Sequence, residues 1–414
     1  MNLQHRHTWG LAFALCLITL AVNLQAPLYT TYAQLSGYGA GATAVAFSGY
    51  VLGVLPVLLA LGGLADRVGR KPLILTALSL SITATIIMLL WPNLMALSLA
   101  RLLLGVGTGL ASATGTAYMT ELMATGDARA PAHWVTASTS LGFGLGAALT
   151  SLFLLSHDSV RPGSFWLQLA LACLAIVVVV RLPDSIVKIK KTPLLRLPTF
   201  PAGSLPYGFS ILLAWATVGV VIALLPSVLA THDLERWSGL STFTVISGGI
   251  LFQPLVRRMQ PANATGLGLL VLPLSYAFLA WGALSGSLVA VLIGALAASS
   301  SCYGFIYLGG LSAVTTMAGA NKVRANAGFF LLAYVGFSIP VILTGLMADY
   351  FGAHIALLVF GLFLLLGATT VGIIIIRDKA YVAKGCGNGR STAMTAAQAA
   401  IMTNVPINTL RIPK

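Results

Sequence analysis

The sequence predicts an all-α polytopic membrane protein with twelve transmembrane helices, on three observations. First, 58% of its 414 residues are hydrophobic and only 8% are charged, whereas soluble domains are about 45–50% apolar and about 25% charged. Second, the apolar residues form long runs, most of them close to the roughly 20 residues that a spanning helix needs. Third, the basic residues gather in alternate connections between these runs.

The first apolar run resembles a secretory signal, because a basic start and an apolar stretch precede the small residue Ala26. Pro27 follows directly and would make a poor cleavage site, so we expect a retained first helix. The predicted spans lie near residues 9–34, 42–65, 72–91, 94–118, 132–156, 165–182, 207–231, 239–256, 264–284, 287–311, 327–349 and 353–376. The connections are short except for a middle loop, 183–206, and a tail, 377–414. We expect the tail to be flexible.

Basic residues orient the predicted bundle. Of the 23 lysines and arginines, Arg161 and Arg236 fall on one side, Arg101 lies inside a helix, and all others share the opposite side. The positive-inside rule assigns that side to the cytoplasm, so we expect both termini there, in a bacterial inner membrane. The bases behind the net charge of +14 are spread over all the inner connections, which fits topology signals facing lipid and argues against nucleic-acid binding.

The stretch GGLADRVGRK, residues 62–71, forms the predicted inner turn between the second and third spans. Gly62 suits close helix packing, Gly69 suits a turn position with positive φ, and Pro72 suits the first turn of the next helix. Asp66 lies near the negative C-terminal end of its helix, the unfavourable end for an acid. We therefore expect Asp66 to serve a partner elsewhere, either a base or the N-terminus of another helix.

This turn closely resembles the signature between helices 2 and 3 of the major facilitator superfamily. ARLLLGVGTGLASA, with Arg101 and Gly105, is similar to that superfamily's helix 4 signature, and YMTELMATGDAR resembles its exit from helix 4. The resemblance covers essentially the whole chain. It implies two pseudo-symmetric six-helix bundles, residues 1–182 and 207–376, with alternating access around a central cavity.

The resemblance also implies a set of gating residues at the inner turns and on the fifth span. On the fifth span, LGFGLGAALTS keeps small residues at close-packing spacing but lacks the proline of the antiporter motif. A small-residue packing face is the simpler interpretation than an antiporter signature, and we expect Gly142 and Gly146 to face a partner helix in the other half. The expected gating residues are Gly62, Asp66, Arg67, Gly69, Arg70, Glu121, Arg129, Gly142 and Gly146.

Arg101 is the one ionisable residue that the sequence places near mid-membrane. A charge there costs at least about 2.5–3.5 kcal/mol, so it should face the bundle interior or water. Arg101 either hydrogen-bonds carbonyls and holds helix 4 against helix 1, or it binds a substrate anion or modulates proton transfer. The sequence leaves both alternatives open.

By the same resemblance, helices 1, 4, 7 and 10 line the central cavity. For each polar residue alone, helix packing is the simpler explanation, and the cluster carries the prediction. The expected substrate-binding residues are Asn23, Gln25, Tyr29, Arg101, Trp215, Thr217, Ser299, Ser300, Tyr303 and Tyr307.

These features predict a secondary active transporter that works by alternating access. We expect a proton-linked exporter of a small amphipathic, neutral or anionic solute, acting as a monomer in the lipid bilayer. The alternatives are an importer or exchanger of a small organic anion, and a sensor with a transporter fold. No nucleophile–base pair, phosphate loop or metal-ligand spacing is visible, so we expect no enzyme activity, no cofactor and no metal.

Overall fold

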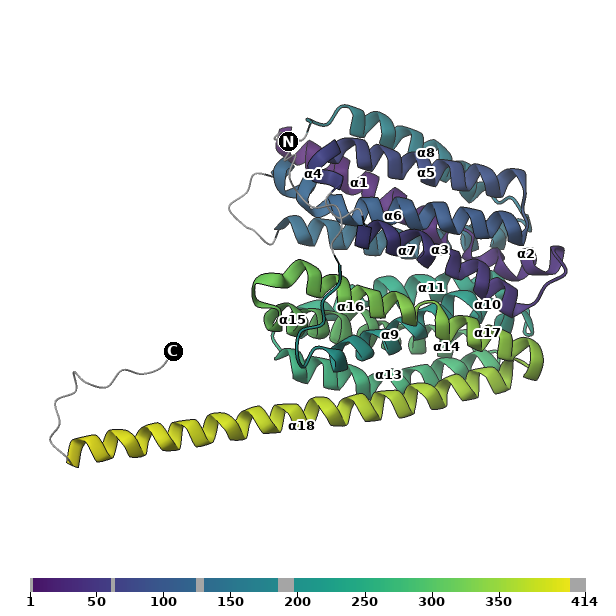
Figure 1. Ribbon diagram of the computed structural model, residues 1–414. Helices are drawn as coiled ribbons and strands as arrows, with labels where there is room; N and C mark the ends of the chain where they lie inside the picture. Colours follow the sequence, from purple (N-terminus) through teal and green to yellow (C-terminus); the bar gives the residue numbers. More distant parts are fainter. Residues whose placement is uncertain (1–2, 61–63, 124–129, 185–196, 403–414) are drawn as a thin grey trace.

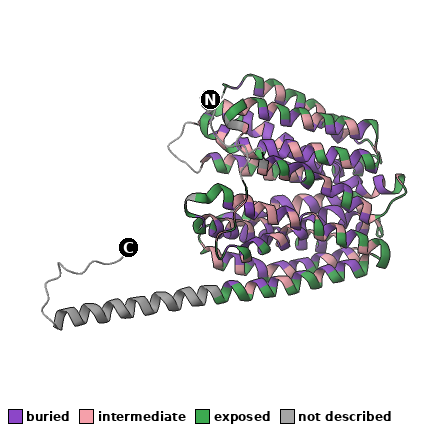
Figure 2. Ribbon diagram, in the orientation of Figure 1, coloured by how far each residue is buried: buried purple, intermediate pink, exposed green. Residues whose placement is uncertain are grey.

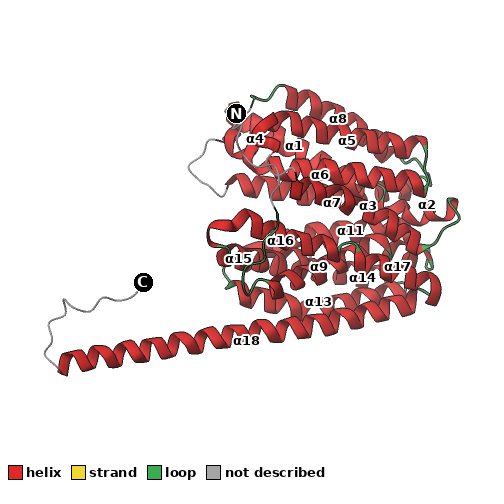
Figure 3. Cartoon of the chain, viewed as in Figure 1, coloured by secondary structure: helices red, strands yellow, loops and turns green. Residues whose placement is uncertain are grey.

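The computed structural model describes residues 3–60, 64–123, 130–184 and 197–402, without the side chains of residues 3–4, 60, 65–66, 320 and 378–402. In these ranges, 12 helical segments are long and apolar enough to cross a membrane, and no residue lies in a strand (Figure 3). The predicted all-α class with twelve spans is therefore confirmed.

The first six spans have the predicted order, with one short helix at the turn after the second span. The first span is broken into three pieces, because Pro27 has no amide hydrogen to donate to the Asn23 carbonyl. The elements are α1 (Leu3–Asn23), η1 (Ala26–Leu28), α2 (Tyr29–Leu35), α3 (Ala40–Ala60), α4 (Leu64–Val68), α5 (Arg70–Leu90), α6 (Leu94–Met123), α7 (Ala130–Ser156) and α8 (Gly163–Val180).

The last six spans are more often interrupted. The tenth contains a π-helical segment, η4, and the eleventh breaks before Pro340, in the first turn of α17. The elements are α9 (Leu205–Ala223), α10 (Leu225–Ala230), η2 (Glu235–Trp237), α11 (Ser238–Ser247), η3 (Gly248–Phe252), α12 (Gln253–Val256), α13 (Pro261–Leu284), α14 (Leu288–Ser299), η4 (Ser300–Ile306), α15 (Tyr307–Met317), η5 (Gly319–Asn321), α16 (Lys322–Gly336), α17 (Ile339–Phe351) and α18 (Ala353–Met402).

The spans form two groups, with α1 to α8 in one and α9 to α18 in the other (Figure 1). Buried residues concentrate where the groups meet, and exposed apolar residues cover the outside, as expected for surface that faces lipid (Figure 2). In the first span, 89% of the residues in an apolar stretch of 18 are buried, whereas in the twelfth span only 28% of such a stretch is buried. The first span is therefore central and the twelfth is peripheral.

The two groups are in contact at the end of the bundle where α2 ends and α3 begins. We call this the outer end, and the end that carries α4 the inner end, after the orientation predicted from the basic residues. At the outer end the Asp349 carboxylate of α17 accepts hydrogen bonds from the amides of Ala40 (2.7 Å) and Gly41 (2.8 Å), at the start of α3. Asp158 and Arg236 add an exposed ion pair between the groups at the same end. The outer end is therefore closed.

Contacts between α7 of the first group and α11–α12 of the second also hold the two groups together, at both ends of the bundle. At the outer end the Gly239 amide donates to the Ser151 hydroxyl (2.9 Å). Between the ends, Gly144 lies directly against α11 side chains. At the inner end the Arg257 guanidinium nitrogens lie 2.9 and 3.1 Å from the ring nitrogens of His133. This side of the bundle is closed along its length.

The structure describes part of the middle segment and part of the tail. In the described part of the segment, the Thr199 amide donates to the Arg324 carbonyl (3.0 Å), and the Arg324 side chain donates back to the Leu197 carbonyl (2.9 Å). These residues therefore dock on the start of α16. In the tail, where we expected flexibility, residues 377–402 continue α18 beyond the bundle (Figure 1). The sequence from 392 to 400 is rich in alanine, which favours helix.

Candidate functional site

Arg101 on α6 lies at the centre of the bundle with no exposed surface. Its Nε donates to the Phe47 carbonyl (3.2 Å) and its Nη1 to the Val22 carbonyl (2.7 Å). Its guanidinium carbon lies 4.5 Å from the centre of the Phe47 ring and 5.0 Å from that of Tyr50. Its Nη2 has no hydrogen-bond partner. The guanidinium therefore joins α1, α3 and α6 and keeps one donor unused, so the structural role shown here leaves room for a ligand.

Three residues of the broken first span, which also supplies the Val22 carbonyl to Arg101, carry further unused polar atoms. The Asn23 amide nitrogen donates to the Phe143 carbonyl (2.9 Å), but its oxygen has no partner. The Gln25 side-chain oxygen and the Tyr29 hydroxyl are also buried without partners. Leaving such groups unpaired costs about 1–3 kcal/mol each. The break at Pro27 therefore exposes side chains that a polar ligand could satisfy.

The second group contributes aromatic rings to the same region. The Trp215 ring on α9 lies 5.1 Å from Tyr334 and 5.7 Å from Phe337, centre to centre. Phe337 in turn lies 4.8 Å from Phe47 of the first group. The Trp215 ring nitrogen is buried and has no acceptor. Aromatic rings therefore bridge the two groups next to Arg101.

The tenth span meets this region through η4, a π-helical segment over residues that we predicted to bind substrate. π-helical turns often occur at functional sites. The Tyr303 ring lies 6.5 Å from Trp215, and the Tyr307 ring lies 6.2 Å from Phe330. The Ser299 hydroxyl is buried without a partner and faces η3.

Two predicted binding residues are already satisfied inside their own helices. The Thr217 hydroxyl donates to the Leu213 carbonyl (3.1 Å) and the Ser300 hydroxyl to the Ala297 carbonyl (2.7 Å). Such bonds to the preceding turn are common for hydroxyls on apolar helices, because no water is present to bind them. In this structure both residues serve their own helix.

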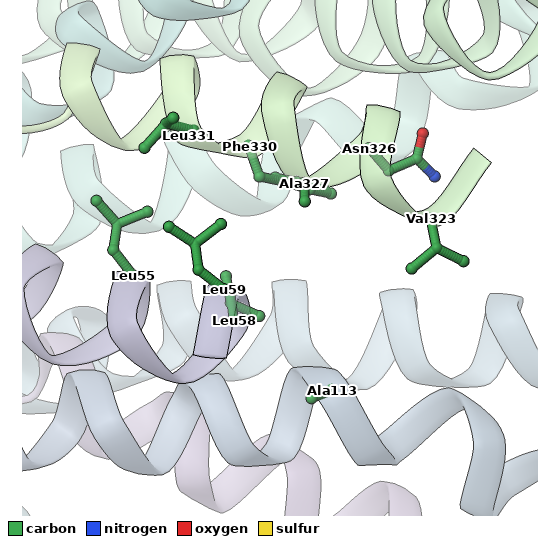
Figure 4. A pocket seen from close by; sticks show the side chains of 9 residues that line it. All are labelled: Leu55, Leu58, Leu59, Ala113, Val323, Asn326, Ala327, Phe330 and Leu331. Carbon is green, nitrogen blue, oxygen red and sulfur yellow. The ribbon is translucent and has the colours of Figure 1, made fainter. Parts of the chain in front are cut away.

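A cavity of about 210 Å³ lies at the inner end between α3, α6 and α16. Figure 4 shows the α16 side chains facing those of α3 across it. It is lined by Leu55, Leu58, Leu59, Ala113, Val323, Asn326, Ala327, Phe330 and Leu331. On the α3–α16 side, the two groups are therefore in contact at the outer end and separated by a cavity at the inner end.

The sequence profile of the Major Facilitator Superfamily matches residues 11–339. The chain belongs to this superfamily. It is 26% identical over 170 residues to the inner membrane transport protein YajR of Escherichia coli (strain K12), over 41% of this chain and 37% of that protein. The matched region therefore spans well under half of either protein.

Solved superfamily structures share the fold. A mutant of the nucleoside transporter NupG has a TM-score of 0.72 at 15% identity, covering 90% of this chain and 100% of that one. The peptide transporter POT in complex with sulfate has a TM-score of 0.68 at 19% identity, covering 89% and 95%. The family and these transporters agree with the expectation of a transporter rather than an enzyme.

The superfamily turn between the second and third spans is tied to its own half of the chain. Gly69 has φ +100°, as the turn requires, directly before α5. Arg70 pairs with Glu121 and also donates to the Ala117 carbonyl (3.0 Å) on α6. Arg67 is exposed near this turn.

Three expected gating positions cannot be placed in the same way. Gly62 and Arg129 lie outside the described residues. The backbone of Asp66 lies in α4, but its side chain is outside the described part.

The prediction for two glycines of α7 needs a correction. We expected Gly142 and Gly146 to face the other half of the molecule. Instead a Cβ on Gly142 would overlap the Cys16 carbonyl of α1, and a Cβ on Gly146 would overlap the Leu20 carbonyl of α1. Glycines spaced four apart share one helix face, and Gly144 points elsewhere, toward Ser247 of α11. Of these three glycines, Gly144 is therefore the one at the interface between the halves.

Sequence reasoning missed the aromatic residues of the second and eleventh spans, because it searched only helices 1, 4, 7 and 10. The spacing of these aromatic residues along the sequence could have revealed them. Phe330, Tyr334 and Phe337 are spaced as i, i+4 and i+7, and Phe47 and Tyr50 as i and i+3, which are the spacings of one helix face.

Proposed function

We propose that the chain is a secondary active transporter that moves a small amphipathic anion by alternating access between its two halves. The observation that carries the proposal is the Arg101 guanidinium, which is fully buried, has one unused donor and meets no carboxylate among the described residues. A buried cation without a counter-ion is costly, and an anionic ligand would supply one. A neutral solute would leave that cost unrelieved.

Unpaired buried polar atoms on the first span and on α9 support the same proposal. The oxygens of Asn23 and Gln25 can accept, the Trp215 nitrogen can donate, and the Tyr29 hydroxyl can do either. These atoms come from both halves, so a ligand that binds them would contact both. A ligand shifts a conformational equilibrium by its differential affinity for the states. Because Arg101 has no exposed surface here, side chains around it must move before a ligand reaches it.

For the mode of transport we propose exchange of one organic anion for another, and the proton-linked export expected from the sequence is the second candidate. A specific observation favours exchange. Among the described side chains, every acid lies near an end of a span or in a connection, so none is placed beside Arg101 to carry a proton. Vesicle flux separates the two modes: export follows an imposed proton gradient, whereas exchange is stimulated by the same anion on the opposite side.

Arg101 variants test the role of the guanidinium. Arg101→Lys keeps the charge but loses the planar two-point contact, so anion affinity should fall moderately. Arg101→Gln should weaken anionic ligands far more than neutral ones of the same shape. Binding of paired anionic and neutral ligands to purified protein measures this selectivity.

Two other outcomes would change the proposal. If Arg101→Gln binds normally and loses only gradient-driven accumulation, the residue acts in proton coupling. If both variants lose melting temperature and expression together, without selectivity among ligands, the two carbonyl contacts are its whole role. Normal binding, flux and stability in Arg101→Gln would contradict every role proposed for it.

A further inference from the structure

The cavity between α3 and α16 lies on the side of the bundle where the two groups part at the inner end. On the opposite side, α7 and α11–α12 are in contact from Ser151 and Gly239 at the outer end to His133 and Arg257 at the inner end. The α3–α16 side is therefore where the space between the groups can meet the surroundings of the bundle.

The cavity borders surface that faces the hydrocarbon of the membrane. On α3, Leu59 lines the cavity, and Leu52, seven residues earlier and so on the same helix face, is 71% exposed on the outside of the bundle. On α16 the lining extends from Val323, which is 58% exposed, to Leu331, or about 12 Å along the helix axis. Half of a hydrocarbon core is about 15 Å thick, so the cavity matches the depth of the inner leaflet.

The cavity is narrow and almost wholly apolar. Asn326 is the one polar residue among the cavity-lining residues, and its side-chain oxygen already accepts from the Thr315 hydroxyl (3.0 Å). In Figure 4 its amide group points away from the α3 leucines. At about 210 Å³ the cavity is smaller than the roughly 300–1,000 Å³ of sites for drug-sized ligands. Its size and lining suit a section of a hydrocarbon chain better than a bulky or polar ligand.

Two exposed bases stand at the inner mouth of this cavity, at the start of α16. Lys322 lies one turn before Asn326, and Arg324 lies seven residues before Leu331, so each base shares a helix face with a residue that lines the cavity. The Arg324 Nε donates to the Leu197 carbonyl (2.9 Å), which holds the guanidinium at this place. Neither base pairs with an acid among the described residues. Bases at inner turns are common topology signals, but these two adjoin an apolar cavity, and a molecule with an anionic headgroup and a hydrocarbon chain complements both features.

We propose that the α3–α16 cavity binds an anionic phospholipid of the inner leaflet, with part of an acyl chain in the cavity and the phosphate at Arg324 and Lys322. A guanidinium can hold a phosphate by two parallel hydrogen bonds, and the ammonium group adds a point charge. The chain would contact both halves in the state in which α3 and α16 are apart. By its preference for that state, the lipid would stabilise the inward-open conformation. This inference goes beyond the proposed function and does not involve Arg101.

Tryptophan fluorescence in nanodiscs tests the identity of the occupant. The discs contain phosphatidylcholine (PC) and phosphatidylglycerol (PG), with bromine, a contact quencher, on the acyl chains of one lipid at a time, and the signal of the seven native tryptophans is subtracted with the wild-type protein. Phe330→Trp places an indole in the cavity wall. Its quenching should show a preference for PG over PC of about fivefold or more, the factor that one base contributes near an anionic membrane surface. Lys322→Gln together with Arg324→Gln should remove that preference.

Two variants serve as matched controls. Phe329→Trp changes the next residue, which is only 2% exposed and packs against Gly310, so neither brominated lipid should quench the added indole. Leu52→Trp, on the outer surface of α3, should be quenched equally by brominated PG and brominated PC.

A second measurement does not depend on the folding of a variant with a bulkier ring. Leu59→Cys is alkylated with a small maleimide, with the wild-type protein as background for its native thiols. Labelling should be several-fold slower in discs that contain PG than in discs of PC alone, and the two glutamine substitutions should remove the difference. Thr316→Cys, exposed on α15 and outside the cavity lining, should be labelled at the same rate in both discs.

The outcomes decide each part of the proposal. If neither brominated lipid quenches Phe330→Trp and PG does not slow labelling at position 59, no chain enters the cavity and the proposal is overturned. Equal quenching by PG and PC, or a preference for PG that survives the two glutamine substitutions, overturns the assignment of the headgroup to Arg324 and Lys322. Neither result bears on anion recognition by Arg101, which is measured with soluble ligands.

Discussion

Asp349 gives the sharpest prediction, because its carboxylate closes the outer end across the two halves. Its two oxygens accept from the Ala40 and Gly41 amides at 2.7 and 2.8 Å, so a negative charge sits on the positive N-terminal end of α3. Asp349 is solvent-exposed, which places this interaction at the lower end of the known range, about 0.3–1 kcal/mol. Asp349→Asn should therefore raise the ratio of outward-open to outward-closed protein by about two- to fivefold. Asp349→Ala removes the cap altogether, and a lost cap costs about 0.5–2 kcal/mol, so its shift should be larger.

Spin labels at Leu35 and Ile355, both exposed near the outer end, report this opening as a longer distance between them. Asp233→Asn is the matched control, since it makes the same chemical change at the outer end in a side chain without a hydrogen bond in the described part of the chain. High salt should reduce the difference between wild type and Asp349→Asn, because the charge is screened. Equal distance distributions in wild type, Asp349→Asn and Asp349→Ala would refute the reasoning.

Three further substitutions test other contacts between the helices. Gly144→Leu should wedge α7 from α11 and arrest transport with little loss of melting temperature, as paired flux and melting measurements would show. Gly142→Leu should instead destabilise the fold by about 1–3 kcal/mol or more, since the new side chain meets α1 backbone within one half. Asp158→Asn should change the outward-open population by less than about fivefold and lose its effect at high salt, because its pair with Arg236 is exposed.

The sequence was sufficient for the fold because hydrophobic length and basic asymmetry are strong signals that do not depend on tertiary contacts. It also predicted that Arg101 faces the bundle interior or water, because a charge near mid-membrane is costly elsewhere. It could not show which face of a helix meets which neighbour. Gly142 and Gly144 look equivalent in the sequence, yet one packs on α1 and the other on α11.

The individual binding residues were less predictable for a related reason. A hydroxyl on an apolar helix can turn back to its own backbone, as at Thr217, or remain unpaired, as at Ser299. Local sequence does not decide between these states, because the choice depends on what packs against the helix. Aromatic spacing, which the sequence analysis did not use, was the more informative signal here, since the rings on one face of α16 share neighbours.

The same five-residue pattern occurs at both ends of the bundle, which leads to a final prediction. Ala65 to Gly69 and Ala348 to Gly352 both have the form Ala-Asp-x-x-Gly, and both glycines have positive φ, +100° and +86°. At the outer end the aspartate caps the start of α3. Superfamily resemblance predicts that Asp66 caps the start of α16 when the inner end is closed. If the halves rock as units, the two caps stabilise opposite states.

Asp66→Asn should then shift the population toward the inward-open state, by about two- to fivefold if the cap is exposed and more if it is partly buried. This is opposite to the shift expected for Asp349→Asn. The double variant should return close to the wild-type ratio, because distant and independent effects add. Maleimide labelling of Leu59→Cys at the inner cavity, together with the outer spin-label pair, measures both ends. Shifts in the same direction for the two single variants would show that the two aspartates do not act on one rocking equilibrium.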